Sequence, residues 1–133
     1  MDELGSPVAD VRYPEARRSV LNSVAALADR EYQQQVWVGR TYPHSGYFDD
    51  LDMNIHILYD DYSVLPNPAG ATGDILVEGA EINRLKVLGA VLDAVIADLG
   101  DARDSEYLAH PRWSEVVSAA GAALSAMVLS GGF

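Results

Sequence analysis

The chain has 133 residues, of which 49% are hydrophobic and 22% are charged, as in a single globular domain of ordinary size. It contains no cysteine, which excludes disulfide bridges, thiol catalysis and cysteine-ligated zinc. Its formal net charge of −11 argues against nucleic acids and anionic membranes as partners, because proteins bind both through lysine and arginine.

The sequence shows neither a secretory signal nor a membrane span. No basic flank precedes an apolar run near the N-terminus, and no stretch reaches the roughly 18 uninterrupted apolar residues of a spanning helix. Together with the lack of cysteine, this pattern predicts a cytoplasmic protein that does not bind membranes.

The negative charge is concentrated in one third of the chain. No lysine or arginine occurs from Thr41 to Asn83, a segment that holds eight acidic residues. These are Asp49, Asp50, Asp52, Asp60, Asp61, Asp74, Glu78 and Glu81. Such a segment suits a basic protein partner, and general solubility is the simpler alternative.

The first residues, 1–13, have no apolar periodicity. We expect a flexible N-terminal arm there, followed by a single helical domain over residues 14–133. Pro14 suits the first position of a helix, because its missing N–H group would have no partner there. Apolar residues at helical spacing then predict a helix up to about Ala28.

A second, short helix is expected over residues 30–38. Asp29 can accept a hydrogen bond from the backbone at the start of this helix, and Gly39 is placed to end it. A loop is expected over residues 40–47.

The stretch from Phe48 to Tyr62 fits two interpretations. Alternation would place Leu51, Met53, Ile55, Ile57 and Tyr59 on one face of a strand. Helical spacing instead aligns Phe48, Leu51, Ile55, Leu58 and Tyr62. The run is 15 residues long and has no internal glycine or proline, which favours a helix.

A connector over residues 64–73 leads to a long fourth helix. Asp74 is expected to cap this helix and Gly100 to end it. Its apolar seam is the strongest periodic signal in the chain: Ile82, Leu85, Leu88, Leu92, Val95 and Leu99.

The last part of the chain predicts a short turn and a final helix. Asp104 or Ser105 is expected to open the turn over residues 106–110, and Pro111 to start the helix. The inner face of that helix is predicted to consist of Trp113, Val116, Val117, Ala120, Leu124, Met127 and Val128. The whole pattern predicts an all-α fold, a compact single-domain bundle of about five helices, some of them short.

The search for catalytic patterns finds none. The chain has no glycine-rich phosphate loop, no nucleophile elbow and no His-Glu-x-x-His motif. We therefore expect no enzymatic activity, no cofactor and no metal.

One group of polar residues depends on residues 48–62 being helical. Because successive residues of a helix turn by about 100°, Asp49, Asp52, His56 and Asp60 would share a face that points away from the core. An aspartate and a histidine four residues apart can share a divalent metal, but no second element offers converging ligands. A solvated acidic face is the simpler interpretation, and a metal-dependent enzyme is the minor alternative.

Apolar and aromatic residues flank this acidic face. Met53 and Ile57 fall beside it, and the loop with Arg40, Tyr42 and Tyr47 adjoins it in sequence. Tyrosine and arginine are enriched among interface residues that dominate binding energy. Alternatively, Met53 and Ile57 pack on another helix, and the tyrosines cover the end of the bundle. The predicted partner-binding residues are Arg40, Tyr42, Tyr47, Asp49, Asp52, Met53, His56, Ile57 and Asp60.

Three stretches of sequence are similar to a known family. They are ADREYQQQVWV over residues 28–38, LYDD over residues 58–61 and YLAHPRW over residues 107–113. The chain resembles an uncharacterised family of small acidic helical proteins from actinobacteria, from about Val11 to Met127. The resemblance implies a single compact domain and supplies no catalytic residues.

The leading functional hypothesis is a non-enzymatic protein-binding domain. Its size and charge are those of immunity proteins and antitoxins, which by analogy suggests an inhibitor of a basic partner protein such as a nuclease toxin. The alternative is a regulatory or scaffold subunit that acts as a homo-oligomer, with a homodimer formed through the alanine-rich last helix.

Overall fold

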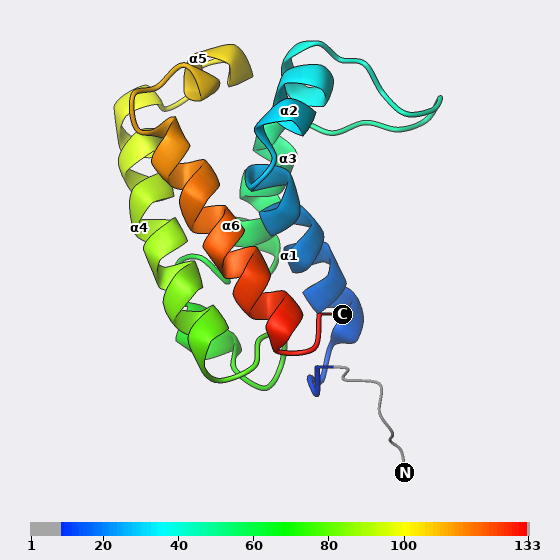
Figure 1. Ribbon diagram of the computed structural model, residues 1–133, viewed down its shortest axis with the longest axis vertical. Helices are drawn as coiled ribbons and strands as arrows, with labels where there is room; N and C mark the ends of the chain where they lie inside the picture. The colour runs from blue at the N-terminus through cyan, green and yellow to red at the C-terminus, as the bar shows by residue number, and fades with distance from the viewer. Residues whose placement is uncertain (1–8, 133) are drawn as a thin grey trace.

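Three long helices form the main body of the structure. The computed structural model describes residues 9–132, and its long helices are α1 (Pro14–Leu27), α4 (Ala80–Leu99) and α6 (Trp113–Leu129). Figure 1 shows α6 between the other two and antiparallel to both. Each long helix therefore buries one face against a neighbour.

Shorter elements connect and cover these helices. In chain order they are α2 (Arg30–Tyr32), the π-helical segment η1 (Gln33–Val38), α3 (Leu51–Ile55), the π-helical segment η2 (His56–Asp61), the 3-10 turn η3 (Pro68–Ala71) and α5 (Asp104–Leu108). Over residues 9–132 there is no strand, and one isolated bridge joins Thr72 to Leu76. The expected all-α, compact single-domain bundle is confirmed, and residues 48–62 are largely helical rather than a strand. No helix in this part of the chain has the length and apolarity to cross a lipid bilayer.

The core lies between α1, α4 and α6. Five residues of the predicted α4 seam are buried: Ile82, Leu85, Leu88, Leu92 and Val95. The sixth, Leu99, is half-buried. On α6 the buried face is Trp113, Val116, Ala120, Ala123 and Met127. The prediction for Val128 is wrong, since 57% of this residue is exposed. The inner face of α6 follows spacings of 3, 4, 3 and 4, and Val128 lies about 100° beyond Met127.

A buried ion pair joins α1 to the start of α4. The Arg17 guanidinium donates to both carboxylate oxygens of Glu81, over 2.8 and 2.9 Å, and neither side chain is exposed. The remaining donors of Arg17 bind the backbone carbonyls of Ile75, Met127 and Gly132. The pair is fully hydrogen-bonded, as a buried charge pair must be.

Three predicted helix starts are corrected, and one is that of α6, which begins at Trp113 rather than at Pro111. The long fourth helix begins at Ala80 after Gly79, not at Asp74. Gly79 has a φ of 126°, which a side chain would strain, so the chain changes direction there. Asp104 begins α5 instead of capping a later turn, and Gly100 ends α4 as expected, with a φ of 56°.

The N-terminal residues are only partly described. Residues 1–8 of the expected arm lie outside the described residues. The end of the arm is held in place, because the backbone N–H groups of Arg12 and Tyr13 donate to the carbonyls of Gly73 and Asp74 over 2.9 and 2.8 Å.

Candidate functional site

A long loop between η1 and α3 projects from the bundle (Figure 1). As expected, Asp29 caps the preceding helix by accepting from the backbone N–H of Tyr32, and that helix ends at Val38. Gly39 does not supply the left-handed turn, which falls on Arg40 with a φ of 54°. Gly39 is needed for space instead, because a Cβ there would lie 2.9 Å from the carbonyl oxygen of Gln35.

Aromatic rings hold the loop together. The ring of Tyr42 lies 6.2 Å from that of Tyr47 and 5.9 Å from that of Phe48, and His44 lies edge-on to Tyr47. Both tyrosines are partly buried against the core. Phe48, which helical spacing placed in the core, is 55% exposed because α3 begins only at Leu51.

Asp49 is the centre of a hydrogen-bonded network. Its carboxylate accepts from the Tyr32 hydroxyl over 2.7 Å, from the Trp37 indole N–H over 2.9 Å and from the Asn54 amide over 2.9 Å. The prediction that Asp49 points away from the core is therefore wrong. Asp49 precedes Asp50, the residue that caps α3, so the helical arc of about 100° per residue does not apply to it.

The network also fixes two tyrosine hydroxyls. Tyr47 and Tyr32 are joined by an O···O contact of 2.6 Å, and Tyr32 donates onward to Asp49. Burial raises the pKa of Tyr32, and the hydrogen bonds with Tyr47 and Asp49 raise it further. Tyr32 thus stays protonated and serves as a donor to the carboxylate.

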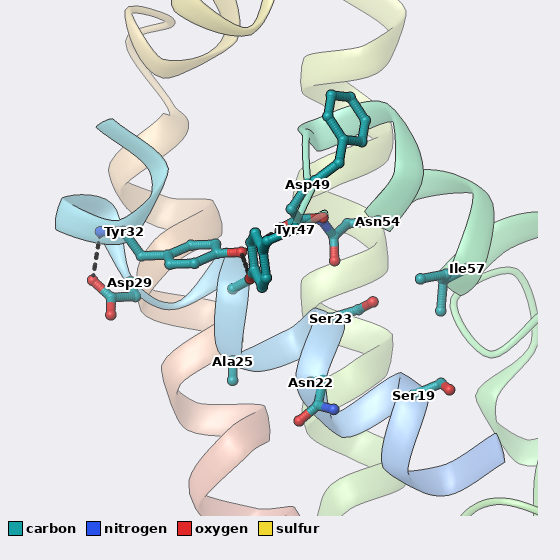
Figure 2. Close-up of a pocket in the computed structure, with 12 residues that line it drawn as sticks. Ser19, Asn22, Ser23, Ala25, Asp29, Tyr32, Tyr47, Asp49, Asn54 and Ile57 are labelled. Carbon is teal, nitrogen blue, oxygen red and sulfur yellow. Dashed lines mark hydrogen bonds between the residues drawn. The ribbon is translucent and has the colours of Figure 1, made fainter. Parts of the chain in front are cut away.

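A groove of about 470 Å³ opens beside this network, between α1 and the segment from Tyr47 to Ile57 (Figure 2). Its lining comprises Ser19, Asn22, Ser23, Ala25, Ala26, Asp29, Tyr32, Tyr47, Phe48, Asp49, Asn54 and Ile57. The contribution of α1 was not predicted from the sequence. The spacing of Ser19, Asn22, Ser23 and Ala26 was the available signal, because it places small and polar side chains on one helical face.

The rest of the predicted acidic face is present on α3 and η2, and we call its three residues, Asp52, His56 and Asp60, the acidic stripe. His56 Nδ1 lies 2.5 Å from Asp60 Oδ2, and His56 Nε2 lies 3.5 Å from Asp52 Oδ2. All three residues are exposed. The hydrogen bond that the ring donates to Asp60 and the charge of Asp52 raise the pKa of His56. Of the flanking apolar residues, Met53 is 40% exposed, whereas Ile57 is half-buried and lines the groove.

Further carboxylates gather where α3 meets α5. Asp104 accepts from the backbone N–H of Leu51 over 3.1 Å. Burial raises the pKa of Asp104, the hydrogen bond from Leu51 opposes this, and the charges of Asp50 and Asp52 raise it again. The charge of Arg40 also acts on Asp104 and lowers its pKa, so this end of the acidic residues adjoins a cation.

Within residues 9–132, no group of three histidine, cysteine, aspartate or glutamate side chains could hold a metal ion. The arrangement instead offers carboxylates, hydroxyls and rings that can accept hydrogen bonds and contact a partner.

Comparison with known proteins gives a family and no closer relative. No curated protein and no solved structure matches the chain. A family model described as a domain of unknown function, DUF7945, matches residues 11–132. The match begins where the resemblance found in the sequence begins and extends a few residues beyond its end at Met127. The chain therefore belongs to the DUF7945 family.

Proposed function

We propose that this chain is a non-enzymatic protein-binding domain and that the surface formed by residues 40–61 binds a basic partner protein. One observation carries the proposal: exposed apolar side chains lie in the same short segment as exposed carboxylates. Phe48 is 55% exposed and Met53 is 40% exposed, while Asp52 and Asp60 are exposed with His56 as their ionic contact.

The two kinds of side chain have different roles in binding. Carboxylates of one sign attract a basic protein over a distance and disfavour acidic competitors. Exposed rings and methionine contribute contact area once the partner has docked, and aromatic residues and methionine are enriched in interfaces. The segment combines both.

An inhibitor of the immunity or antitoxin type is the specific form of this proposal. A nuclease toxin needs a cationic surface to bind nucleic acid. An acidic domain that covers this surface would block access to the substrate without any chemistry of its own. Such a domain acts in the cytoplasm and needs no cofactor, membrane or nucleic acid.

The test compares charge reversal at two places, using the protein that co-purifies with the chain from its native host. Asp52→Lys combined with Asp60→Lys should slow association by about tenfold or more at low salt, and much less at high salt, because exposed charges are screened over about 8 Å at physiological ionic strength. The control is Glu15→Lys combined with Glu78→Lys. Both residues are exposed; Glu15 lies in the first turn of α1 and Glu78 lies just before α4. These two helix starts are at the other end of the bundle (Figure 1).

Association rates measured by surface plasmon resonance decide between the outcomes. Equal slowing by both pairs would mean that only net charge matters, and no slowing by either would place the interface elsewhere. Phe48→Ala should instead raise the dissociation rate with little dependence on salt, because a ring contributes contact area.

A homo-oligomer remains the second candidate, and three exposed apolar residues favour it. Val87 on α4 is 52% exposed, and Val128 and Leu129 at the end of α6 are 57% and 88% exposed. Light scattering during gel filtration tests this candidate, since a dimer through these helices should have twice the monomer mass and should dissociate in Val87→Asp.

A further inference from the structure

We propose that the groove between α1 and the segment from Tyr47 to Ile57 binds a guanidinium group. The guanidinium can belong to an arginine of the basic partner, in which case the inference rests on the proposed function. It can also belong to a free guanidinium compound, and the inference is then independent of the proposed function. The shared chemistry follows from the groove itself.

The groove contains buried polar atoms that lack a partner. Ser23 is 2% exposed, and no group over residues 9–132 hydrogen-bonds its hydroxyl. Asn54 is 4% exposed, and its amide nitrogen donates to Asp49 and to the carbonyl of Asp50. Its amide oxygen has no donor in the same part of the chain. Figure 2 shows this oxygen turned toward the space above Ser23.

These two side chains point to a ligand that donates hydrogen bonds. Most buried polar groups in proteins are paired, and an unpaired one is costly. Ser23 is not required by helix α1, since alanine has the higher helix propensity. An unpaired acceptor on Asn54 and an unpaired hydroxyl on Ser23 are both satisfied by a group with several N–H donors.

The charge of the groove favours a cation. Asp29 and Asp49 line it, and its lining contains no lysine, arginine or histidine. The Asp49 carboxylate receives hydrogen bonds from three neutral donors, and no ion pair involves it within the described part of the chain. The negative charge therefore stays available to a positively charged ligand.

The rings favour guanidinium over ammonium. Tyr32, Tyr47 and Phe48 line the groove, and a planar guanidinium stacks on aromatic rings while its edge presents five donors. An ammonium is compact, strongly hydrated and has three donors. The volume of about 470 Å³ lies in the range of about 300–1,000 Å³ that is usual for small-ligand sites.

The experiment titrates the full chain with three capped amino acids and follows amide shifts by NMR. The first probe is N-acetyl-arginine methylamide. The second is the matching citrulline compound, which is neutral and has nearly the same shape, and the third is the matching lysine compound. The arginine probe should bind at least about tenfold more tightly than the citrulline probe, because hydrogen bonds to a charged group are the stronger ones. The largest shifts should fall on Ser23, Tyr47 and Asn54.

Ser23→Ala supplies the test of the groove. This substitution should weaken binding of the arginine probe about fivefold. It should leave the denaturation midpoint unchanged or raise it, because it removes an unpaired buried hydroxyl. Ser114→Ala, an exposed serine on α6, is the matched control and should change neither quantity. A merely structural Ser23 would lower the midpoint and leave the probe's affinity unchanged.

Four results would overturn the proposal: no shift with any probe, equal affinity for arginine and citrulline, tighter binding of lysine, or an affinity for the arginine probe that Ser23→Ala leaves unchanged. The source of the guanidinium is decided separately. If Ser23→Ala weakens both the probe and the native partner, the group is an arginine of the partner. If it weakens only the probe, the groove takes a free compound. If the arginine probe binds but no protein partner is found, this inference holds and the proposed function is wrong.

Discussion

The two sides of the molecule are built differently. The side formed by α4 and α6 consists of long regular helices that bury leucine, valine and alanine along continuous seams. The side formed by residues 29–61 consists of short helices, a projecting loop and a polar network around Asp49. The first arrangement serves stability, and the second holds the groove, the acidic stripe and the exposed rings.

The helical geometry differs as well. Both π-helical segments lie on the second side, one before the loop and one after α3. In each, the residue after the segment closes a wide turn: Gly39 donates to the carbonyl of Gln34, and Tyr62 donates to that of Ile57. Such wide turns are rare and occur frequently at functional sites. The irregular side is therefore where function is expected.

The largest effect is expected from breaking the buried ion pair on the regular side. Glu81→Ala leaves the Arg17 guanidinium buried without its carboxylate and should lower the free energy of unfolding by about 3–5 kcal/mol. Urea denaturation followed by circular dichroism measures this change.

The control for the ion pair is Glu115→Ala. Glu115 contacts Arg112 on the surface, over 3.1 Å, and its loss should leave the denaturation midpoint almost unchanged. A similar loss in both variants would contradict the view that burial gives the Arg17–Glu81 pair its importance.

The regular side was largely predictable from the sequence. The α4 seam and the end of α4 at Gly100 follow from the helical period and from glycine, which are local signals. The Arg17–Glu81 pair was not predicted, because its partners are 64 positions apart. Arg17 does lie at helical spacing from Val20, Leu21 and Val24, which are all buried, and this spacing was the available sign of its burial.

A smaller effect is expected from Asp49 on the irregular side. Asp49→Ala leaves the Tyr32 hydroxyl, the Trp37 indole and one Asn54 donor without their acceptor. It should lower the free energy of unfolding by about 1–3 kcal/mol and should change the fluorescence of Trp37. Asp52→Ala, whose carboxylate is exposed, should stay within about 0.5 kcal/mol of the parent. Equal effects would contradict the structural role of Asp49.

The candidate site was only partly predictable. Asp52, His56 and Asp60 come together as helical spacing implies, because they belong to one continuous helical stretch. The hydrogen-bonded position of Asp49, the exposure of Phe48 and the groove were not predicted, because they depend on where α3 begins and on how α1 packs beside it. Side chains from different elements meet through tertiary packing, which periodicity does not encode.

The smallest effect concerns the protonation of His56. Because its pKa is raised in the folded state, the stabilisation it provides is fully present below the unfolded value of about 6.5 and is lost as pH rises through the folded value. NMR titration of the His56 ring should show Asp60→Asn lowering this pKa most and Asp52→Asn less, since Asp60 lies 2.5 Å away and Asp52 lies 3.5 Å away. Asp98→Asn, which removes the partner of His110, should leave it unchanged. If Asp52→Asn lowers the pKa of His56 more than Asp60→Asn does, the contacts of His56 in solution differ from those described. The arrangement of charge that the stripe offers to a partner would then differ as well.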